Sequence, residues 1–147
     1  MAAEAARAGG AQVDLYDAMP SVGRKFLLAG KGGLNLTHSE PLERMLTRYG
    51  ARKPEIAPLL KAFPPDTLRA WVAGFGIDTF VGSSGRVFPK DMKSAPLLRA
   101  WLRRLRKSGV SFHVRHRWQG WSDDGMLRFE TPTGERLIRA DGVVLAL

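Results

Sequence analysis

The pattern of apolar and polar positions predicts helices that alternate with strands. Residues 2–8 are alanine-rich and favour a helix, which the glycine pair after them ends. Residues 12–17 alternate apolar and polar side chains, so they favour a short strand that closes on Asp17. A small-residue helix followed by a strand that ends in an acid is typical of the second half of a β–α–β unit.

The middle of the chain predicts short helices followed by a hairpin. Three helices are expected between residues 39 and 76, with Ser39 as the cap of the first and Asp66 as the cap of the third. Residues 77–81 and 86–88 favour two strands joined by a glycine–serine turn. We expect this block, about residues 39–92, to be a helical insertion in an α/β framework.

The C-terminal third combines one strongly amphipathic helix with several strands. Residues 94–108 place leucines and Trp101 on one face and basic side chains on the other, which predicts a helix. Residues 110–121 favour one half-buried strand, and two later strands separated by glycine turns complete a three-stranded β-meander. The unbroken apolar run 143–147 predicts a buried parallel strand. The chain therefore predicts an α/β fold over residues 1–147.

Residues 23–37 are rich in glycine and in positive charge. Glycine allows backbone N–H groups to approach a ligand, and nearby cations favour an anion such as phosphate or pyrophosphate. A solvated basic loop without a ligand is the alternative. A P-loop is excluded, because Lys25 stands where that motif requires glycine and Gly32 where it requires serine or threonine.

Composition narrows the possible functions. The chain has no cysteine, which excludes disulfides and thiol catalysis and fits a cytoplasmic protein. No run of 18 apolar residues predicts a membrane span. Lys and Arg number 23 against 14 Asp and Glu, giving a net charge of +9. A basic nucleic-acid-binding module is one alternative, supported by the acid-free stretch 99–117 with Trp101 and Trp118 near its ends.

Histidines do not predict a metal site. The sequence contains three, at positions 38, 113 and 116, and none has companions at metal-ligand spacing. Because His113 and His116 lie three apart in a predicted strand, we expect them on opposite faces.

Several motifs in order resemble one protein family. They are the alanine-rich helix, Val13-x-Leu15-x-Asp17, Gly23-Arg24-Lys25, the glycine cluster, Asn35-x-Thr37, Gly85-Arg86-Val87-Phe88-Pro89, Gly109-Val110, the meander and Ala140-Asp141-Gly142-Val143-Val144-Leu145-Ala146. This arrangement resembles the YhiN-like bacterial family of NAD(P)/FAD-dependent flavoproteins, also described as BaiN-like or aminoacetone-oxidase-like. The resemblance covers nearly the whole chain. It differs where the family usually has serine, glycine, arginine and cysteine, because this chain has Ala29, Lys31, Gly33 and Leu34.

The resemblance implies the FAD-binding portion of a flavin-dependent oxidoreductase. The expected cofactor is FAD, with NAD(P)H as a candidate electron donor and an unknown small molecule as substrate. Relatives begin with a strand and a Gly-x-Gly-x-x-Gly turn and continue after the last strand. The resemblance therefore implies an incomplete Rossmann-like domain, truncated at both ends, whose partners include the missing parts of its own parent chain. We expect such a fragment to bind FAD weakly and to be inactive alone.

The family also implies roles for individual residues. Asp17 would accept hydrogen bonds from the adenosine ribose, and the backbone of Trp118 would contact adenine. The residues expected along the pyrophosphate are Gly23, Arg24 and Lys25. Those expected on the path toward the flavin are Gly32, Gly33, Asn35 and Thr37. No catalytic residue and no metal ligand is assigned.

Overall fold

The computed structural model describes residues 1–28 and 32–146. The chain divides into two compact units, one formed by Met1–Arg24 with Leu102–Leu147 and the other by Lys25–Trp101. The division falls within helices α2 (Arg24–Leu28) and α6 (Ser94–Lys107). The expected insertion at residues 39–92 lies inside the second unit, and its boundaries remain a prediction.

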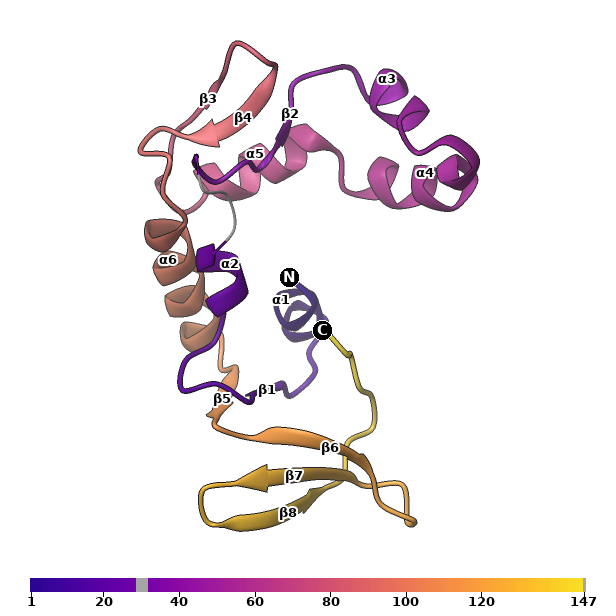
Figure 1. Ribbon diagram of the computed structural model, residues 1–147, viewed down its shortest axis with the longest axis vertical. Helices are drawn as coiled ribbons and strands as arrows, with labels where there is room; N and C mark the ends of the chain where they lie inside the picture. The colour runs from indigo at the N-terminus through magenta and orange to yellow at the C-terminus, as the bar shows by residue number, and fades with distance from the viewer. Residues whose placement is uncertain (29–31, 147) are drawn as a thin grey trace. The chain divides into compact units, whose positions relative to one another are not determined.

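The first unit contains a parallel strand pair and an antiparallel meander. Its other elements are α1 (Ala2–Ala8), β1 (Asp14–Asp17), β5 (Ser111–Val114), β6 (Arg117–Trp121), β7 (Leu127–Thr131) and β8 (Gly134–Ile138). Strand β1 lies beside β5 (Figure 1). The two strands pair in parallel, with Asp17 opposite Val114. The meander has the order β6-β7-β8. An α/β fold with a three-stranded meander is thus confirmed.

Apolar burial and two side chains of α1 hold the first unit together. The buried side chains are Val22, Leu105, Val110, Leu127 and Phe129. From α1, Glu4 forms an ion pair with Arg104 at 3.0 Å, and Arg7 donates to the carbonyl of Ser108. The Arg7 bond supplies a partner to a carbonyl just beyond the end of α6, a region where helices leave carbonyls unsatisfied.

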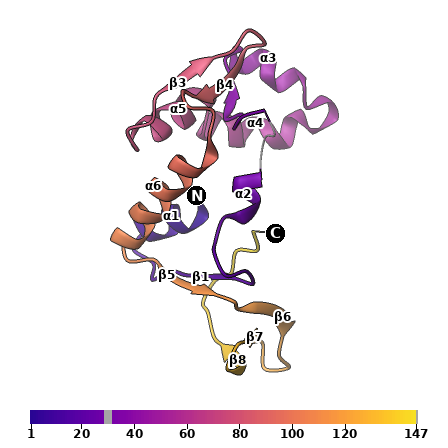
Figure 2. The ribbon, with the colours of Figure 1, turned by 60° about the vertical axis from the view of Figure 1, so that its left-hand side comes forward.

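The second unit is a set of short helices around a small sheet. Besides α2 and the first half of α6, its elements are β2 (Thr37–His38), α3 (Leu42–Thr47), the 3-10 helix η1 (Gly50–Arg52), α4 (Lys53–Ala62), α5 (Pro65–Ala73), β3 (Thr79–Val81) and β4 (Arg86–Pro89). The antiparallel sheet has the order β2-β4-β3. Figure 2 shows β3 and β4 of this sheet from a second side. Its core joins Leu34, Val72 and Leu97, and Trp71 packs edge-on against Trp101 at 4.9 Å.

Both predicted helix caps are wrong. Helix α3 begins after Pro41 and α5 after Pro64, and neither has a side-chain cap. The backbone N–H of Ser39 instead donates to the carbonyl of Gly85, which keeps residue 39 beside the β3–β4 hairpin. Proline suits the first turn of a helix because its missing N–H would have had no intrahelical acceptor there. In α5, Pro65 therefore occupies the first helical position and Asp66 lies within the first turn.

Two strand predictions are also corrected. The expected single strand 110–121 divides into β5 and β6, which belong to different sheets, because the backbone bends at Arg115 with φ 57°. The apolar run 143–147 forms no strand within its described part, residues 143–146, and Val144 is 71% exposed. A buried parallel strand needs hydrogen-bonded neighbours and covered faces, whereas residues 143–146 belong to no sheet of the described residues and are exposed. Leu147 lies outside the described residues.

Candidate functional site

Asp17 lies at the carboxyl end of β1, where open α/β sheets bind their ligands. Its carboxylate is half-buried, and Oδ1 accepts a hydrogen bond from the backbone N–H of Met19 at 2.8 Å. This side-chain-to-backbone hydrogen bond forms a turn that orients the carboxylate of Asp17 toward the loop that follows it. Its other oxygen, Oδ2, has no donor among the described residues, so it can still accept a hydrogen bond from a ligand.

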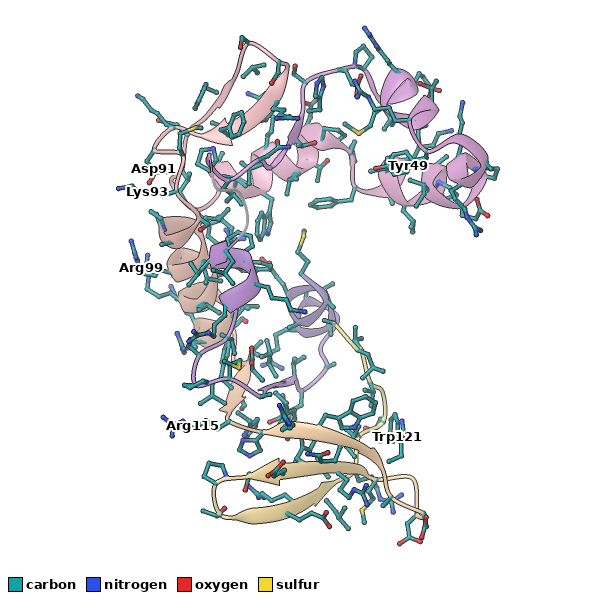
Figure 3. The ribbon with its side chains drawn as sticks, viewed as in Figure 1. Tyr49, Asp91, Lys93, Arg99, Arg115 and Trp121 are labelled. Carbon is teal, nitrogen blue, oxygen red and sulfur yellow. The ribbon has the colours of Figure 1, made fainter. Side chains whose placement is uncertain are left out.

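The loop after Asp17 is bound to the bend between β5 and β6. The N–H of His116 donates to the carbonyl of Asp17, and the N–H of Arg115 donates to the carbonyl of Met19, both at 3.0 Å. Figure 3 labels Arg115 at this bend. Trp118, three residues after Arg115, lies in β6. The structure therefore brings Asp17 and the start of β6 together, although the sequence places them far apart.

Trp118 lies in an edge strand of the meander. It stands opposite Phe129 of β7, and its ring meets that of Trp121 edge-on at 6.0 Å. Its indole Nε1 is buried without an acceptor in the described part of the chain. Because β6 pairs on one side only, its outer edge offers unpaired backbone groups, as a backbone contact to a ligand requires.

Gly23 comes directly before α2, and Arg24 and Lys25 are the first two residues of that helix. Gly23 has φ 77°, which favours glycine over other residues at this turn. The side chains of Arg24 and Lys25 are exposed, and neither forms an ion pair with a residue in 1–28 or 32–146. Two cations without protein counter-ions beside a turn are able to bind an anionic group.

The remaining expected residues lie in the second unit and have different surroundings. Gly32 is exposed and Asn35 is exposed, whereas Thr37 is half-buried in β2 opposite Val87 of β4. A Cβ on Gly33 would lie 2.5 Å from Cε of Met92, so a protein side chain fills that space. Residues 29–31 of the glycine cluster lie outside the described residues. They include Ala29 and Lys31, two of the positions at which this chain differs from the usual family sequence.

The Arg86-Val87-Phe88-Pro89 motif has a structural explanation. These four residues are β4, the central strand of the small sheet, and Val87 and Pro89 are among its most buried side chains. The carbonyl of Val87 accepts the N–H of Leu36 at 2.8 Å. The motif therefore fixes the segment that contains Asn35 and Thr37.

Comparison with known families settles the fold family. A family model described as the HI0933-like protein Rossmann domain matches residues 1–147. The chain belongs to the HI0933-like family. This is the FAD-binding, YhiN/BaiN-like family that the motifs resemble, so that prediction is confirmed. A comparison with curated protein sequences gave no match.

The residues of this HI0933-like chain fit the adenosine and pyrophosphate parts of FAD. Among the described residues, Asp17 keeps a free acceptor oxygen at the carboxyl end of β1, and the unpaired outer backbone edge of β6 lies next to it. Arg24, further along the chain in the same unit, supplies an exposed positive charge. Gly33 does not fit the role of a ligand-facing glycine, because Met92 covers it.

A cluster of aromatic and titratable side chains beneath this site was not anticipated. Tyr16 stacks on His113 and on Phe129, with ring centroids 4.5 Å apart in each case. His113 Nε2–H donates to Asp14 Oδ1 at 2.7 Å. Burial, then the charge of Asp14, raises the pKa of Tyr16, and Arg136 opposes them.

The expectation that His113 and His116 face opposite sides is wrong. Their ring centroids lie 5.7 Å apart, because the bend at Arg115 interrupts the two-residue alternation of a strand. Apolar and polar positions alternate up to Val114, and the three consecutive polar residues Arg115, His116 and Arg117 then break the pattern, which is the one sequence signal of the bend. Within the described residues, no group of three His, Cys, Asp or Glu side chains could hold a metal ion.

Two further findings bear on partners. No helix in the described part of the chain has both the length and the apolar character needed to cross a membrane. Trp101 packs in the core of the second unit against Trp71 and Phe26, so it is not an exposed platform for a nucleic-acid base. Nothing therefore supports the nucleic-acid alternative.

Proposed function

We propose that this chain is an FAD-binding module of a flavin-dependent oxidoreductase. The observation that supports this most is the position of Asp17, an acid with a remaining acceptor oxygen at the carboxyl end of a parallel strand, in a chain of an FAD-binding family. NAD(P)H is the candidate electron donor. The substrate is a small molecule of unknown class.

Asp17 would hold the adenosine ribose. A ribose presents two neighbouring hydroxyl donors, and a carboxylate is the side chain that accepts hydrogen bonds without competing as a donor. The outer backbone edge of β6 at Trp118 would contact adenine. The two backbone bonds between the Asp17–Met19 loop and the bend hold these groups near each other.

Gly23, Arg24 and Lys25 would bind the pyrophosphate. Their contribution is electrostatic, so added salt should weaken it. In the second unit, Gly32, Asn35 and Thr37 would lie toward the flavin, and Gly33 would support them by packing on Met92. When bound, FAD supplies the redox chemistry, and the protein binds and orients it. We assign no catalytic residue.

The affinity of the chain for FAD should be weak. No Gly-x-Gly-x-x-Gly turn occurs in the sequence, and in dinucleotide-binding folds that turn supplies the close backbone approach to the pyrophosphate. A binding test must therefore reach millimolar ligand concentrations.

The test is a titration of the isotope-labelled chain with FAD, followed by backbone NMR shifts. The amides of Asp17 and Trp118 should shift in a saturable way. Asp17→Asn should weaken binding about tenfold or more, because hydrogen bonds to a charged group contribute about 1.5–3 kcal/mol. Asp124→Asn removes the same charge at the β6–β7 turn of the same unit and should leave the affinity unchanged.

The outcomes are separable. No saturable shift at millimolar FAD would contradict cofactor binding by this chain. Equal affinities for the wild-type and Asp17→Asn chains would contradict the ribose role of Asp17 while leaving cofactor binding intact. An equal loss in Asp124→Asn would show that net charge, and not the position of Asp17, controls the affinity.

A further inference from the structure

The bend between β5 and β6 needs a specific stabiliser. Arg115 has φ 57°, which is uncommon for a residue with a side chain and costs free energy unless its surroundings maintain it. The two strands joined by the bend belong to different sheets. The conformation at Arg115 therefore sets how the meander leaves the parallel pair.

The side chain of His116 bridges this bend. Its Nδ1 lies 2.8 Å from the carbonyl oxygen of Val114, the last residue of β5. A carbonyl only accepts, so Nδ1 must carry the proton. The other ring nitrogen, Nε2, is buried and has no partner among the described residues. The Nδ1–H bond is therefore the polar interaction that orients the ring.

Aromatic neighbours on three strands enclose the same ring. Its centroid lies 5.7 Å from that of Tyr16 in β1, 5.7 Å from that of His113 in β5 and 6.3 Å from that of Phe129 in β7. Tyr16 is itself held between His113 and Phe129. The ring thus has little freedom to leave Val114.

The bend in turn holds the loop that carries the ribose-binding candidate. The N–H groups of Arg115 and His116 bond the carbonyls of Met19 and Asp17, one on each side of Ala18. The carboxylate of Asp17 bonds the N–H of Met19 in the same loop. A change at the bend would therefore displace both the carboxylate of Asp17 and the start of β6.

We propose that His116 is a positioning residue of the adenosine site, acting through its Nδ1–H bond to the Val114 carbonyl. It touches no ligand. It holds the bend at Arg115, and the bend fixes Asp17 and Trp118 relative to each other. The proposal for ligand binding rests on the proposed function, whereas the effect on the loop does not.

Two substitutions separate the hydrogen bond from the ring. His116→Phe keeps an aromatic ring in the cluster and removes the donor. His116→Asn removes the ring and keeps an N–H donor near the position of Nδ1. The measured quantity is the native-state hydrogen exchange of the amides of residues 115 and 116, with the amides of β7 as an internal reference.

We expect exchange at residues 115 and 116 to be at least about fivefold faster in His116→Phe, because the hydrogen bond that holds the bend is lost. His116→Asn should restore part of the protection, and the β7 amides should change less than those of the bend. Unchanged protection at 115 and 116 in His116→Phe would overturn the proposal, as would a uniform change that includes β7.

The wild-type chain provides a measurement that does not depend on how the variants fold. The nitrogen chemical shifts of His116 report which ring nitrogen carries the proton. The Nδ1–H form is expected, and an Nε2–H form would overturn the proposal because the bond to Val114 could not then exist.

Titration with ADP connects the bend to ligand binding. His116→Phe should weaken ADP binding about fivefold or more, and His116→Asn should recover part of it. An ADP affinity in His116→Phe equal to that of wild type would overturn the positioning role. If wild type binds neither ADP nor FAD, the proposed function fails, and hydrogen exchange still decides whether His116 holds the loop.

Discussion

Gly33 packs directly against Met92. A Cβ at position 33 would lie 2.5 Å from Cε of Met92 and 3.3 Å from its Cβ, and the N–H of Leu34 donates to the carbonyl of Met92 at 2.9 Å. Both residues have positive φ, 132° for Gly33 and 61° for Met92. The backbone at Gly33 therefore packs against the side chain of Met92, which is distant in sequence. A glycine at position 33 allows this close approach.

Gly33→Ala should destabilise the second unit by about 1–3 kcal/mol, chiefly because alanine rarely adopts this backbone conformation, and its Cβ would also lie only 3.3 Å from that of Met92. Gly32→Ala is the control, since no atom lies within 4 Å of its Cβ position and its φ is not positive. Chemical denaturation measures both. Equal effects of the two substitutions would contradict the packing role of Gly33.

Glu40, in the second unit, forms ion pairs with Arg44 and Arg48. Its side chain is 5% exposed, and Arg48 donates to Oε2 at 2.8 Å. This hydrogen bond, followed by the charges of Arg48, His38 and Arg44, lowers the pKa of Glu40, while burial opposes them. A carboxyl whose pKa is lowered by folding stabilises the fold when it is ionised.

Glu40→Gln should therefore lower the thermal midpoint at neutral pH. The difference from wild type should shrink as pH falls below the ordinary glutamate pKa of about 4.3, because the wild-type carboxylate then becomes protonated as well. Glu43→Gln, at an exposed position in the first turn of α3, is the control and should have a small effect. A constant difference across the acid range would contradict the assigned role of Glu40.

Local patterns predicted most of the elements. The helix expected at 94–108 is observed as Ser94–Lys107, because its leucine stripe and terminal glycine are local signals. Asp17 was also predictable, since an acid at the end of a short strand follows from the sequence alone. Its placement at the end of a parallel strand is confirmed, and its ribose contact stays a prediction.

Features that depend on distant segments were not predictable. The bend at Arg115 is held by bonds to Asp17 and Met19, and the polar run at residues 115–117 does not say which distant segment supplies these partners. The role of Gly33 depends on Met92, which no local pattern connects to it. The same limit explains the apolar run 143–146, because hydrophobicity predicts that a segment can be buried but not which neighbours cover it.

Residues 143–146 should exchange their amide hydrogens rapidly. They form no strand and no hydrogen bond with another described residue, and Val143, Val144 and Leu145 are 39%, 71% and 52% exposed. Their protection should be far below that of β7, which pairs on both sides. Hydrogen exchange followed by NMR measures the two groups together. Comparable protection would show that the run is paired as the sequence predicted.

Gly85 and Gly76 form a matched pair for testing a second close contact. Both have positive φ, 79° and 73°, so alanine is strained at each. A Cβ on Gly85 would also lie 2.6 Å from Cε1 of His38, whereas the Cβ position of Gly76 has nothing within 4 Å. The ring of His38 is fixed there, because Nδ1 lies 3.1 Å from the N–H of Glu40 and Nε2 lies 3.0 Å from the carbonyl of Ser84.

Gly85→Ala should therefore be more destabilising than Gly76→Ala by about 1–2 kcal/mol, the typical cost of displacing a hydrogen-bonded group. Denaturant unfolding of the two variants gives the difference directly. Adding His38→Ala should remove most of the excess cost at position 85 and leave the cost at position 76 unchanged, since the two glycines then share only backbone strain. If the excess persists without the imidazole, the contact with His38 is not its cause.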